Sequence, residues 1–177
     1  MAVIETERLA LRRLTPQDVD RLMSILADPV AMRHYPSTLG RPEVEAWVER
    51  QLQSYRLHGI GFLAVEDREG RFLGQCGLLR QEIDGRGELE VAYLFARSAW
   101  GHGYATEAAR ACRDWGFRER GCGRLVSLIR PVNLPSIRVA ERNGMHPAGA
   151  LMKSGMPHVV YAIRRDEWLR MGILPVP

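Results

Sequence analysis

The sequence predicts an α/β (α+β) fold in which helices flank one mixed sheet. Strand-like and helix-like segments alternate along the chain, and its middle has the pattern of antiparallel strands joined by short turns. A strand–helix–strand stretch over residues 88–129 is long enough for a crossover between parallel neighbours. We therefore expect a mostly antiparallel sheet that contains one parallel pair.

The first half of the chain contains a strand, two helices and the start of the antiparallel strands. Residues 9–14 alternate apolar and polar positions, and Thr15-Pro16-Gln17-Asp18 has the pattern of a helix start. Asp28-Pro29 should end this helix, and Arg41-Pro42-Glu43 should begin a second one with a single apolar face. Turns that contain Asp and Gly then separate three expected strands at 62–66, 72–81 and 88–95.

The second half of the chain contains two helices and two strands. Each helix ends at a glycine, Gly121 for the first and Gly144 for the second, as is common at helix ends. A terminal segment, Arg165-Asp166-Glu167-Trp168, follows the last strand. The expected helices cover 105–118, starting near Tyr104, and 134–143, and the expected strands cover 125–129 and 159–163.

The length and composition are those of one globular domain. The chain has 177 residues, of which 46% are hydrophobic and 26% charged, so it can bury a hydrophobic core without disulfides or structural metals to stabilise it. We expect a single domain over residues 1–177. The three cysteines, Cys76, Cys112 and Cys122, are an odd, unclustered set without metal-ligand spacing. This set predicts no metal site and fits a reducing cytoplasm.

Charge and hydropathy argue against two classes of partner. The formal net charge is +4, but the basic residues are dispersed along the chain, so no nucleic-acid footprint is indicated. No segment approaches the roughly 20 apolar residues of a membrane span. Glu5, Glu7 and Arg8 stand where a signal peptide needs its apolar stretch. We expect a cytoplasmic protein without membrane contact that mildly attracts anionic ligands.

The segment Trp100-Gly101-His102-Gly103-Tyr104-Ala105-Thr106-Glu107 is the most informative part of the chain. It runs from an expected strand directly into an expected helix, so its backbone N–H groups are unpaired and lie at the positive end of the helix dipole. Its two glycines lack a Cβ and let a phosphate approach closely. The pattern predicts a pyrophosphate site, with an ordinary strand-to-helix turn as the alternative.

Several motifs together carry a family resemblance. They are Thr6-Glu7-Arg8-Leu9-Ala10-Leu11-Arg12, Asp28-Pro29, Met32, Tyr35-Pro36, Glu90-Val91-Ala92-Tyr93, the glycine turn, residues 133–145 and residues 161–168. In this order and spacing, the chain resembles the GNAT superfamily of acyl-CoA-dependent N-acyltransferases. Within it, the chain is similar to the branch of ribosomal-protein N-acetyltransferases, RimJ and RimL.

The resemblance implies a seven-stranded, mostly antiparallel sheet whose parallel central strands, 88–95 and 125–129, splay apart to hold the pantetheine arm of acetyl-CoA. Backbone groups around Leu94–Ala96 would bind that arm and polarise the thioester carbonyl. Trp100 replaces the Gln or Arg that usually begins the family's pyrophosphate motif. His102 stands between the two glycines, where a place near the phosphates and a solvated loop position are equally compatible with the sequence. The implied cofactor-binding residues are Leu94, Phe95, Ala96, Gly101, His102, Gly103, Tyr104, Ala105, Thr106, Asn133, Ser136 and Arg142.

Candidate catalytic residues stand at matching family positions. Asn133 and Ser136 are locally a helix cap and a first-turn hydroxyl, and the resemblance implies that both lie beside the cofactor. Ala140 occupies the place of the tyrosine acid of many relatives, which leaves Ser136 as the candidate acid. Glu90 matches the family's general base. Glu88 lies on the same strand face, and a solvated face of the sheet would account for both glutamates.

The implied activity is transfer of the acetyl group of acetyl-CoA to a primary amine by direct attack in a ternary complex. The acceptor is a protein N-terminal α-amine, such as that of a ribosomal protein, or a small-molecule amine. Its cleft is expected to be lined by the segment Met32-Arg33-His34-Tyr35 and the loop 153–158, although a core or surface role accounts equally for Tyr35 and His34. No cysteine belongs to a nucleophile constellation, which disfavours a covalent intermediate. Because Trp100 and Ala140 depart from the family pattern, the alternative function is an acyl-CoA-binding module with weak catalytic activity. Dimerisation is common among relatives, so a homodimer is also possible.

Overall fold

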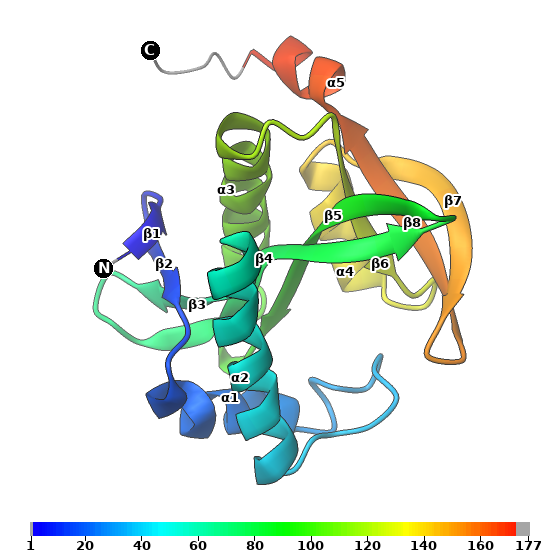
Figure 1. Ribbon diagram of the computed structural model, residues 1–177. Coiled ribbons are helices and arrows are strands. Elements are labelled where there is room, and N and C mark those ends of the chain that lie inside the picture. Colours follow the sequence, from blue (N-terminus) through cyan, green and yellow to red (C-terminus); the bar gives the residue numbers. More distant parts are fainter. Residues whose placement is uncertain (1, 173–177) are drawn as a thin grey trace.

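The computed structural model describes residues 2–172 as one eight-stranded sheet flanked by helices (Figure 1). The strand order is β1-β2-β3-β4-β5-β6-β8-β7, and within residues 2–172 only β5 and β6 are parallel neighbours. The strands are β1 (Ala2–Glu5), β2 (Leu9–Arg13), β3 (Phe62–Asp67), β4 (Phe72–Ile83), β5 (Arg86–Phe95), β6 (Arg124–Ile129), β7 (His146–Lys153) and β8 (Met156–Arg164). The helices are α1 (Val19–Leu26), α2 (Arg41–His58), α3 (Tyr104–Glu119), α4 (Leu134–Arg142) and α5 (Arg165–Arg170).

This architecture confirms the predicted α/β (α+β) class and the parallel pair, with eight strands rather than the seven implied by the resemblance. Two edge strands, β1 and β7, lacked a recognisable pattern in the sequence. β1 has only four residues, and β7 is exposed along most of its length, with Pro147 and Gly149 at a shift of its pairing register. The expected acceptor loop 153–158 is instead the tight turn of the β7–β8 hairpin together with the adjoining strand ends.

The hairpins are tighter than expected because their turns use left-handed residues. Asp84 and Gly85 join β4 to β5 with φ of 51° and 73°, and Ser154 and Gly155 join β7 to β8 with φ of 50° and 73°. Two-residue turns with both φ positive match the twist of the flanking strands. β4 and β5 consequently extend to Ile83 and from Arg86, beyond the expected strand ends.

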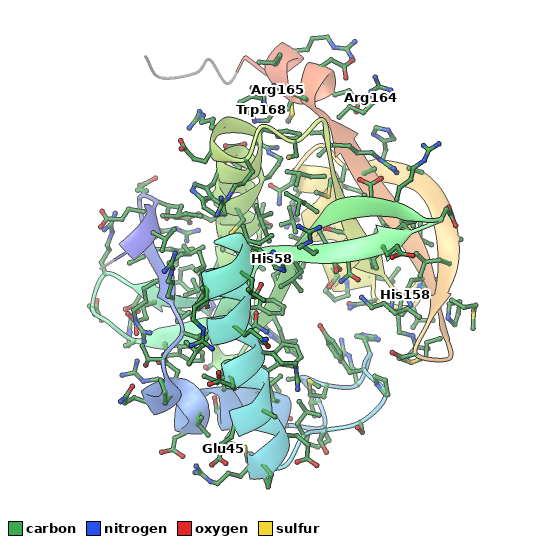
Figure 2. All side chains as sticks on the ribbon, in the orientation of Figure 1. Glu45, His58, His158, Arg164, Arg165 and Trp168 are labelled. Carbon is green, nitrogen blue, oxygen red and sulfur yellow. The ribbon has the colours of Figure 1, made fainter. Side chains whose placement is uncertain are left out.

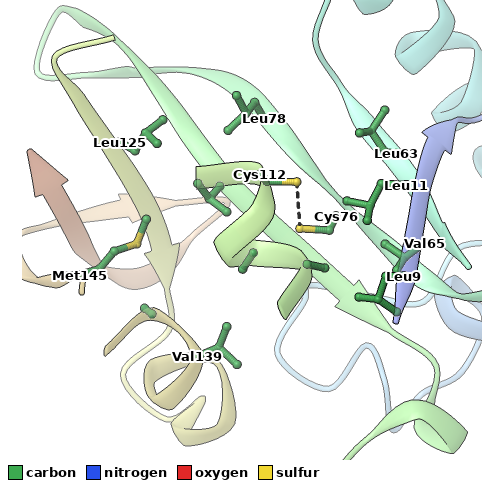
Figure 3. Close-up of a cluster of buried hydrophobic side chains, with 14 of the residues drawn as sticks. Leu9, Leu11, Leu63, Val65, Cys76, Leu78, Cys112, Leu125, Val139 and Met145 are labelled. Atoms are coloured by element: carbon green, nitrogen blue, oxygen red, sulfur yellow. Dashed lines mark hydrogen bonds between the residues drawn. The ribbon is translucent and has the colours of Figure 1, made fainter. Parts of the chain in front are cut away.

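The two faces of the sheet pack against different helices. In Figure 1, α2 lies in front of the sheet and α3 behind it. The α2 side is a cluster that includes Val44, Val48 and Phe62. The α3 side includes Leu78 and the thiols of Cys76 and Cys112, whose sulfurs lie 3.6 Å apart (Figure 3). Both thiols are fully buried, so they serve as core side chains.

The C-terminal helix α5 packs against the end of α3 through Trp168 (Figure 2). The Trp168 ring stacks on Phe117 with centroids 5.1 Å apart, and its Nε1 donates to Asp114 at 2.8 Å. This contact fixes the far end of the helix whose N-terminus adjoins the glycine turn. Across residues 2–172, no helix combines the length and apolarity needed to cross a bilayer.

Candidate active site

The parallel strands β5 and β6 separate shortly after they meet. Their register ends at Glu90 with Val126, although both strands continue beyond this point. β6 stays paired with β8 throughout, so the opening lies between β5 and β6. At its start, the Ser127 hydroxyl donates to the carbonyl oxygen of Val91 at 2.7 Å. A narrow wedge therefore opens in the middle of the sheet, lined on one side by the last residues of β5.

The sheet pattern decides which backbone groups of β5 face this wedge. The N–H of Ala96 donates to the β4 residue Leu73 at 2.9 Å, and the β4–β5 register runs without a bulge. In an antiparallel pair, every second residue turns both backbone groups toward the same neighbour. Tyr93 and Phe95 therefore face the wedge, whereas the expected Leu94 and Ala96 turn their backbone groups toward β4.

The glycine turn between β5 and α3 has the backbone geometry that an anion site needs. Gly101 and Gly103 both have φ of 80°, a conformation that residues with a Cβ rarely adopt. The N–H of Glu107 closes the first helical turn on the carbonyl oxygen of Gly103 at 3.1 Å. The amides of residues 104–106 precede this bond, so they point out of the positive end of α3.

The N-terminal segment of the chain holds this first turn of α3. Glu107 accepts hydrogen bonds from the Thr6 hydroxyl at 2.6 Å, the Arg8 backbone N–H at 3.0 Å and Arg8 Nε at 2.7 Å. Another guanidinium nitrogen of Arg8 donates to the carbonyl oxygen of His102 at 3.0 Å. Burial opposes ionisation of Glu107, but the bonds from Thr6 and Arg8 outweigh it and lower its pKa. The paired charge of Glu107 limits its repulsion of an anion at the turn.

A cavity of about 340 Å³ joins the wedge to the glycine turn. The end of β5 and the start of α3 form part of its wall, and α4 and the segment after α1 form the rest. Most of the expected site residues line it. They are His34, Tyr35, Leu94, Phe95, Gly101, Gly103, Tyr104, Ala105, Thr106, Asn133, Ser136 and Arg142.

Three expected site residues lie outside this lining. Ala96 follows β5 and its N–H is bound to β4. His102 is exposed and stacks on Tyr104 with ring centroids 5.7 Å apart, a placement that fits a solvated loop position. Glu90 lies earlier on β5, where the wedge begins.

Sequence reasoning missed several residues that line the cavity. The Tyr93 hydroxyl donates to the carbonyl oxygen of Ser136 at 2.9 Å and so connects β5 to α4 across the wedge. Strand alternation could have found Tyr93, since it shares a face with Phe95. Trp100, noted only as a departure from the family motif, donates through Nε1 to the Phe95 carbonyl oxygen at 2.9 Å. Arg33 belongs to the segment expected at the acceptor cleft, and the other missed residues are Ala31, Ala99, Pro135, Arg138 and Val139.

Asn133 and Ser136 combine the local role and the site position. The Asn133 side-chain oxygen accepts from the Ser136 N–H at 3.4 Å, as expected of the cap of α4. Both residues also line the cavity. Ala140, at the position of the acid in many relatives, is 1% exposed in the core. Ser136 is thus the hydroxyl that α4 places at the cavity wall.

Glu90 is a buried carboxylate at the closed end of the wedge, and its residue is 7% exposed. Its Oε2 accepts from Gln81 Nε2 at 2.5 Å and lies 3.9 Å from Lys153 Nζ. Its Oε1 accepts from the Leu128 N–H at 3.2 Å. Burial raises the pKa of Glu90, while Lys153, Leu128 and Gln81 oppose the rise without cancelling it. A carboxylate with a raised pKa is a better proton acceptor near neutral pH.

Glu88, the other candidate base, is engaged elsewhere. Its Oε1 accepts from a guanidinium nitrogen of Arg124 at 2.7 Å, which links the start of β5 to the start of β6. This ion pair gives Glu88 a structural role.

His34 and Tyr35 bring the segment after α1 to the cavity. Tyr35 is 39% exposed, but burial around its hydroxyl and the charge of Glu90 raise its pKa to about 12. Burial and the charges of Arg33 and Arg130 lower the pKa of His34, so its ring is neutral at pH 7. The acceptor wall expected here therefore presents a neutral hydroxyl, a neutral imidazole and the nearby carboxylate of Glu90.

The parts of this site suit three tasks. The glycine turn can bind phosphate, the edge of β5 can pair with an extended chain, and Glu90 can accept a proton.

Comparisons with known proteins agree with this geometry. The family model described as Acetyltransferase (GNAT) domain matches residues 8–146. The chain is 41% identical over 158 residues to YkkB, an uncharacterised protein of Bacillus subtilis (strain 168). The alignment covers 88% of this chain and 92% of YkkB.

Solved structures extend the agreement to the fold. The acetyltransferase from Agrobacterium tumefaciens str. C58 superposes with a TM-score of 0.79 at 29% identity, covering 91% of this chain and 93% of that one. RimL, a ribosomal L7/L12 alpha-N-protein acetyltransferase in complex with coenzyme A, superposes with a TM-score of 0.77 at 17% identity, covering 94% and 99%. The second likeness shows the fold alone. The family match over residues 8–146 establishes that the chain belongs to the GNAT acetyltransferase family, whose members are acetyl-CoA-dependent enzymes.

Proposed function

We propose that this chain transfers the acetyl group of acetyl-CoA to a primary amine, with the amine attacking the thioester directly in a ternary complex. One observation carries the proposal: the wedge between β5 and β6 opens into a cavity that ends at the glycine turn of α3. The same cavity thus offers a strand edge for an extended thiol arm and a helix N-terminus for phosphate.

The cofactor would bind mainly through backbone groups. The amides of residues 101–106 would hold the diphosphate, assisted by Arg142, which lines the cavity. The backbone of Tyr93 and the N–H of Phe95 face the wedge and would bind the pantetheine amides and the thioester carbonyl. This choice revises the expected Leu94–Ala96 set, because the sheet alternation turns Leu94 and Ala96 away.

Glu90 would act as the general base, directly or through water. The amine nitrogen bonds to the thioester carbonyl carbon, the carbon–sulfur bond breaks, and the amine proton passes to Glu90. Its placement among Gln81, Leu128 and Lys153 supports this role, because the carboxylate is held in one orientation. The thiolate would take its proton from solvent or from Ser136, an undemanding step since thiols have a pKa of about 8.5.

The acceptor would be an amine that a weak base can deprotonate. At pH 7, deprotonation costs roughly 4–5 kcal/mol for an ε-amine with a pKa of about 10.4 and about 1–1.5 kcal/mol for an α-amine with a pKa near 8. The lower cost favours an α-amine of a protein or small molecule here, the class of acceptor for which RimL is named. The RimJ/RimL branch, a single domain over 1–177 and a cytoplasmic location are part of the same proposal.

The test measures coenzyme A release with a panel of amines, together with calorimetry of coenzyme A binding. We expect micromolar to millimolar binding of coenzyme A and thiol release that depends on an added amine. Tight binding without thiol release from any amine, and without a change on Glu90→Gln, would instead indicate an acyl-CoA-binding module. Absence of coenzyme A binding by folded protein would overturn the proposal entirely.

A further inference from the structure

Two arginines near His34, Arg33 in the cavity lining and Arg130 outside it, lack the ion pairs that many other arginines of the described residues make. Arg33 lines the cavity, its Nε donates to His34 Nε2 at 3.1 Å, and its guanidinium lies 5.6 Å from the centre of the Trp100 ring. Within residues 2–172, no carboxylate lies within ion-pair distance of Arg33. Its charge thus faces the cavity beside a neutral ring.

Arg130 directly follows β6, at the end of the strand that bounds the wedge. Its Nε is buried and has no hydrogen-bond partner among the described residues. Both Arg130 and Arg33 act electrostatically on His34, and both favour its neutral form. Arg33 and Arg130 therefore both lie near one neutral imidazole. Neither makes an ion pair within residues 2–172, so an anion at this end of the cavity would meet two positive charges that no carboxylate neutralises.

The nearby carboxylates are already engaged and cannot supply that partner. Asp28, at the start of the same segment, accepts from Arg97 Nε at 2.6 Å. Glu90 is hydrogen-bonded to Gln81 and lies 3.9 Å from Lys153 Nζ. The described lining of the cavity contains three arginines and no acidic residue. Two of these arginines, Arg138 and Arg142, lie on α4, whereas Arg33 lies on the segment after α1, near Arg130.

We propose that the acceptor of this enzyme carries a carboxylate close to its amine, with Arg33 and Arg130 binding the carboxylate and Glu90 serving the amine. This inference rests on the proposed function. A guanidinium matches a carboxylate with two parallel hydrogen bonds, which gives both affinity and orientation. The same positive wall repels a second ammonium group, so polyamines should be poor acceptors. Free amino acids and peptides with an acidic first residue share the required chemistry.

The test compares acceptors that differ only in the group beside the amine. β-Alanine, β-alaninamide and 1,3-diaminopropane supply a carboxylate, a carboxamide and a second amine on one scaffold. Because the three amines differ in pKa, kcat/KM is calculated for the deprotonated amine of each. The dipeptides Asp-Ala and Asn-Ala make the same comparison for a peptide. We expect kcat/KM to be at least about tenfold higher for the carboxylate member of a set, since hydrogen bonds to charged groups are the stronger ones. The set with the larger ratio identifies the source of the carboxylate.

Variants test whether the two arginines cause that preference. Arg33→Gln and Arg130→Gln should each lower the carboxylate-to-carboxamide ratio toward one, and Arg33→Lys should retain part of it. Arg56→Gln is the matched control, because Arg56 is an exposed arginine of α2 paired with Glu49. Thermal unfolding of each variant separates loss of the preference from loss of the fold.

Three results would overturn the inference. One is a higher kcat/KM for 1,3-diaminopropane than for β-alanine, and another is a carboxylate preference that survives in Arg33→Gln and Arg130→Gln. A third is weaker coenzyme A binding in both variants, which would assign the arginines to the cofactor phosphates. If no amine supports thiol release, the proposed function fails, but the anion site can still be tested by calorimetry of β-alanine binding to protein loaded with coenzyme A. Binding of β-alanine to the unaltered protein that is lost in both variants supports the anion site. Binding that is equal in all three proteins, or absent from the unaltered protein, contradicts it.

Discussion

The cofactor side of the cavity is formed mainly by backbone groups, whereas its acceptor side is formed by side chains. The cofactor side consists mainly of backbone groups, from the glycine turn, the first turn of α3 and the edge of β5, with the side chain of Arg142 beside them. The acceptor side consists of side chains from separate segments, such as Tyr35 after α1, Glu90 on β5 and Lys153 on β7. Backbone groups can keep their geometry while side chains vary. The first set therefore suits a ligand common to the family, and the second an acceptor particular to this chain.

Substitution of Glu90, on the acceptor side, should cause the largest loss of activity. Glu90→Gln preserves the size of the side chain but cannot accept a proton, so kcat should fall about 10²-fold or more, the usual contribution of general-base catalysis. Coenzyme A affinity should stay unchanged, because the cofactor groups are backbone amides at the other end of the cavity. Steady-state kinetics and calorimetry check the two expectations. Glu88→Gln is the matched control, since its ion pair with Arg124 is structural. Equal losses in both variants would remove the distinction between the two glutamates.

Cofactor binding should be most sensitive to a change in the backbone of the glycine turn. Gly103→Val forces a β-branched residue into a φ of 80°, at a cost of about 1–3 kcal/mol that the turn can relieve only by moving. We expect the dissociation constant of coenzyme A to rise roughly 10- to 100-fold, measured by calorimetry. Gly70→Val is the control, because Gly70 has φ of 79° in the β3–β4 turn, away from the cavity. The control should lose similar stability and keep coenzyme A binding; weakened binding in both would mean that the effect is global.

The same contrast explains how much the sequence could predict. The glycine turn, the helix after it and the parallel pair depend on neighbours along the chain, and their patterns predicted them. The surroundings of Glu90 come from β4, β6 and β7, which no local pattern brings together. The strand β7 itself was missed because its residues are mostly exposed and lack alternation. The family resemblance identified Glu90 as a candidate, and only the tertiary structure supplied its partners.

Lys153, the single lysine of the chain, offers a finer test of the acceptor side. Its ammonium favours the ionised form of Glu90, whereas burial favours the protonated form. Lys153→Met should therefore raise the pKa of Glu90 further. Since the base works only when deprotonated, the acid limb of the kcat/KM profile should move to higher pH, by up to about one unit.

The pH profile needs a check on the other groups near Glu90. Tyr35 and Tyr93 are the other titratable groups in electrostatic contact with it, and burial raises the pKa of both above the working range. Lys153→Arg keeps the positive charge and should restore the original profile. An unshifted acid limb in Lys153→Met would mean that the limb reports a group other than Glu90.

Ser136 should give the smallest effect of the series. Its hydroxyl lies at the cavity wall, but its backbone carbonyl, rather than its side chain, accepts from Tyr93 at 2.9 Å. Ser136→Ala leaves that bond and the cap from Asn133 in place, because both use backbone atoms of residue 136. A thiolate leaving group needs little help from an acid near pH 8.5, so kcat should fall less than about threefold there. The loss should grow as the pH falls below that value, because protonation of the thiolate then contributes more. A large, pH-independent loss would instead assign the hydroxyl to binding of the cofactor or the acceptor, and would add a second α4 side chain beside Arg142 to a cavity half built mainly from backbone.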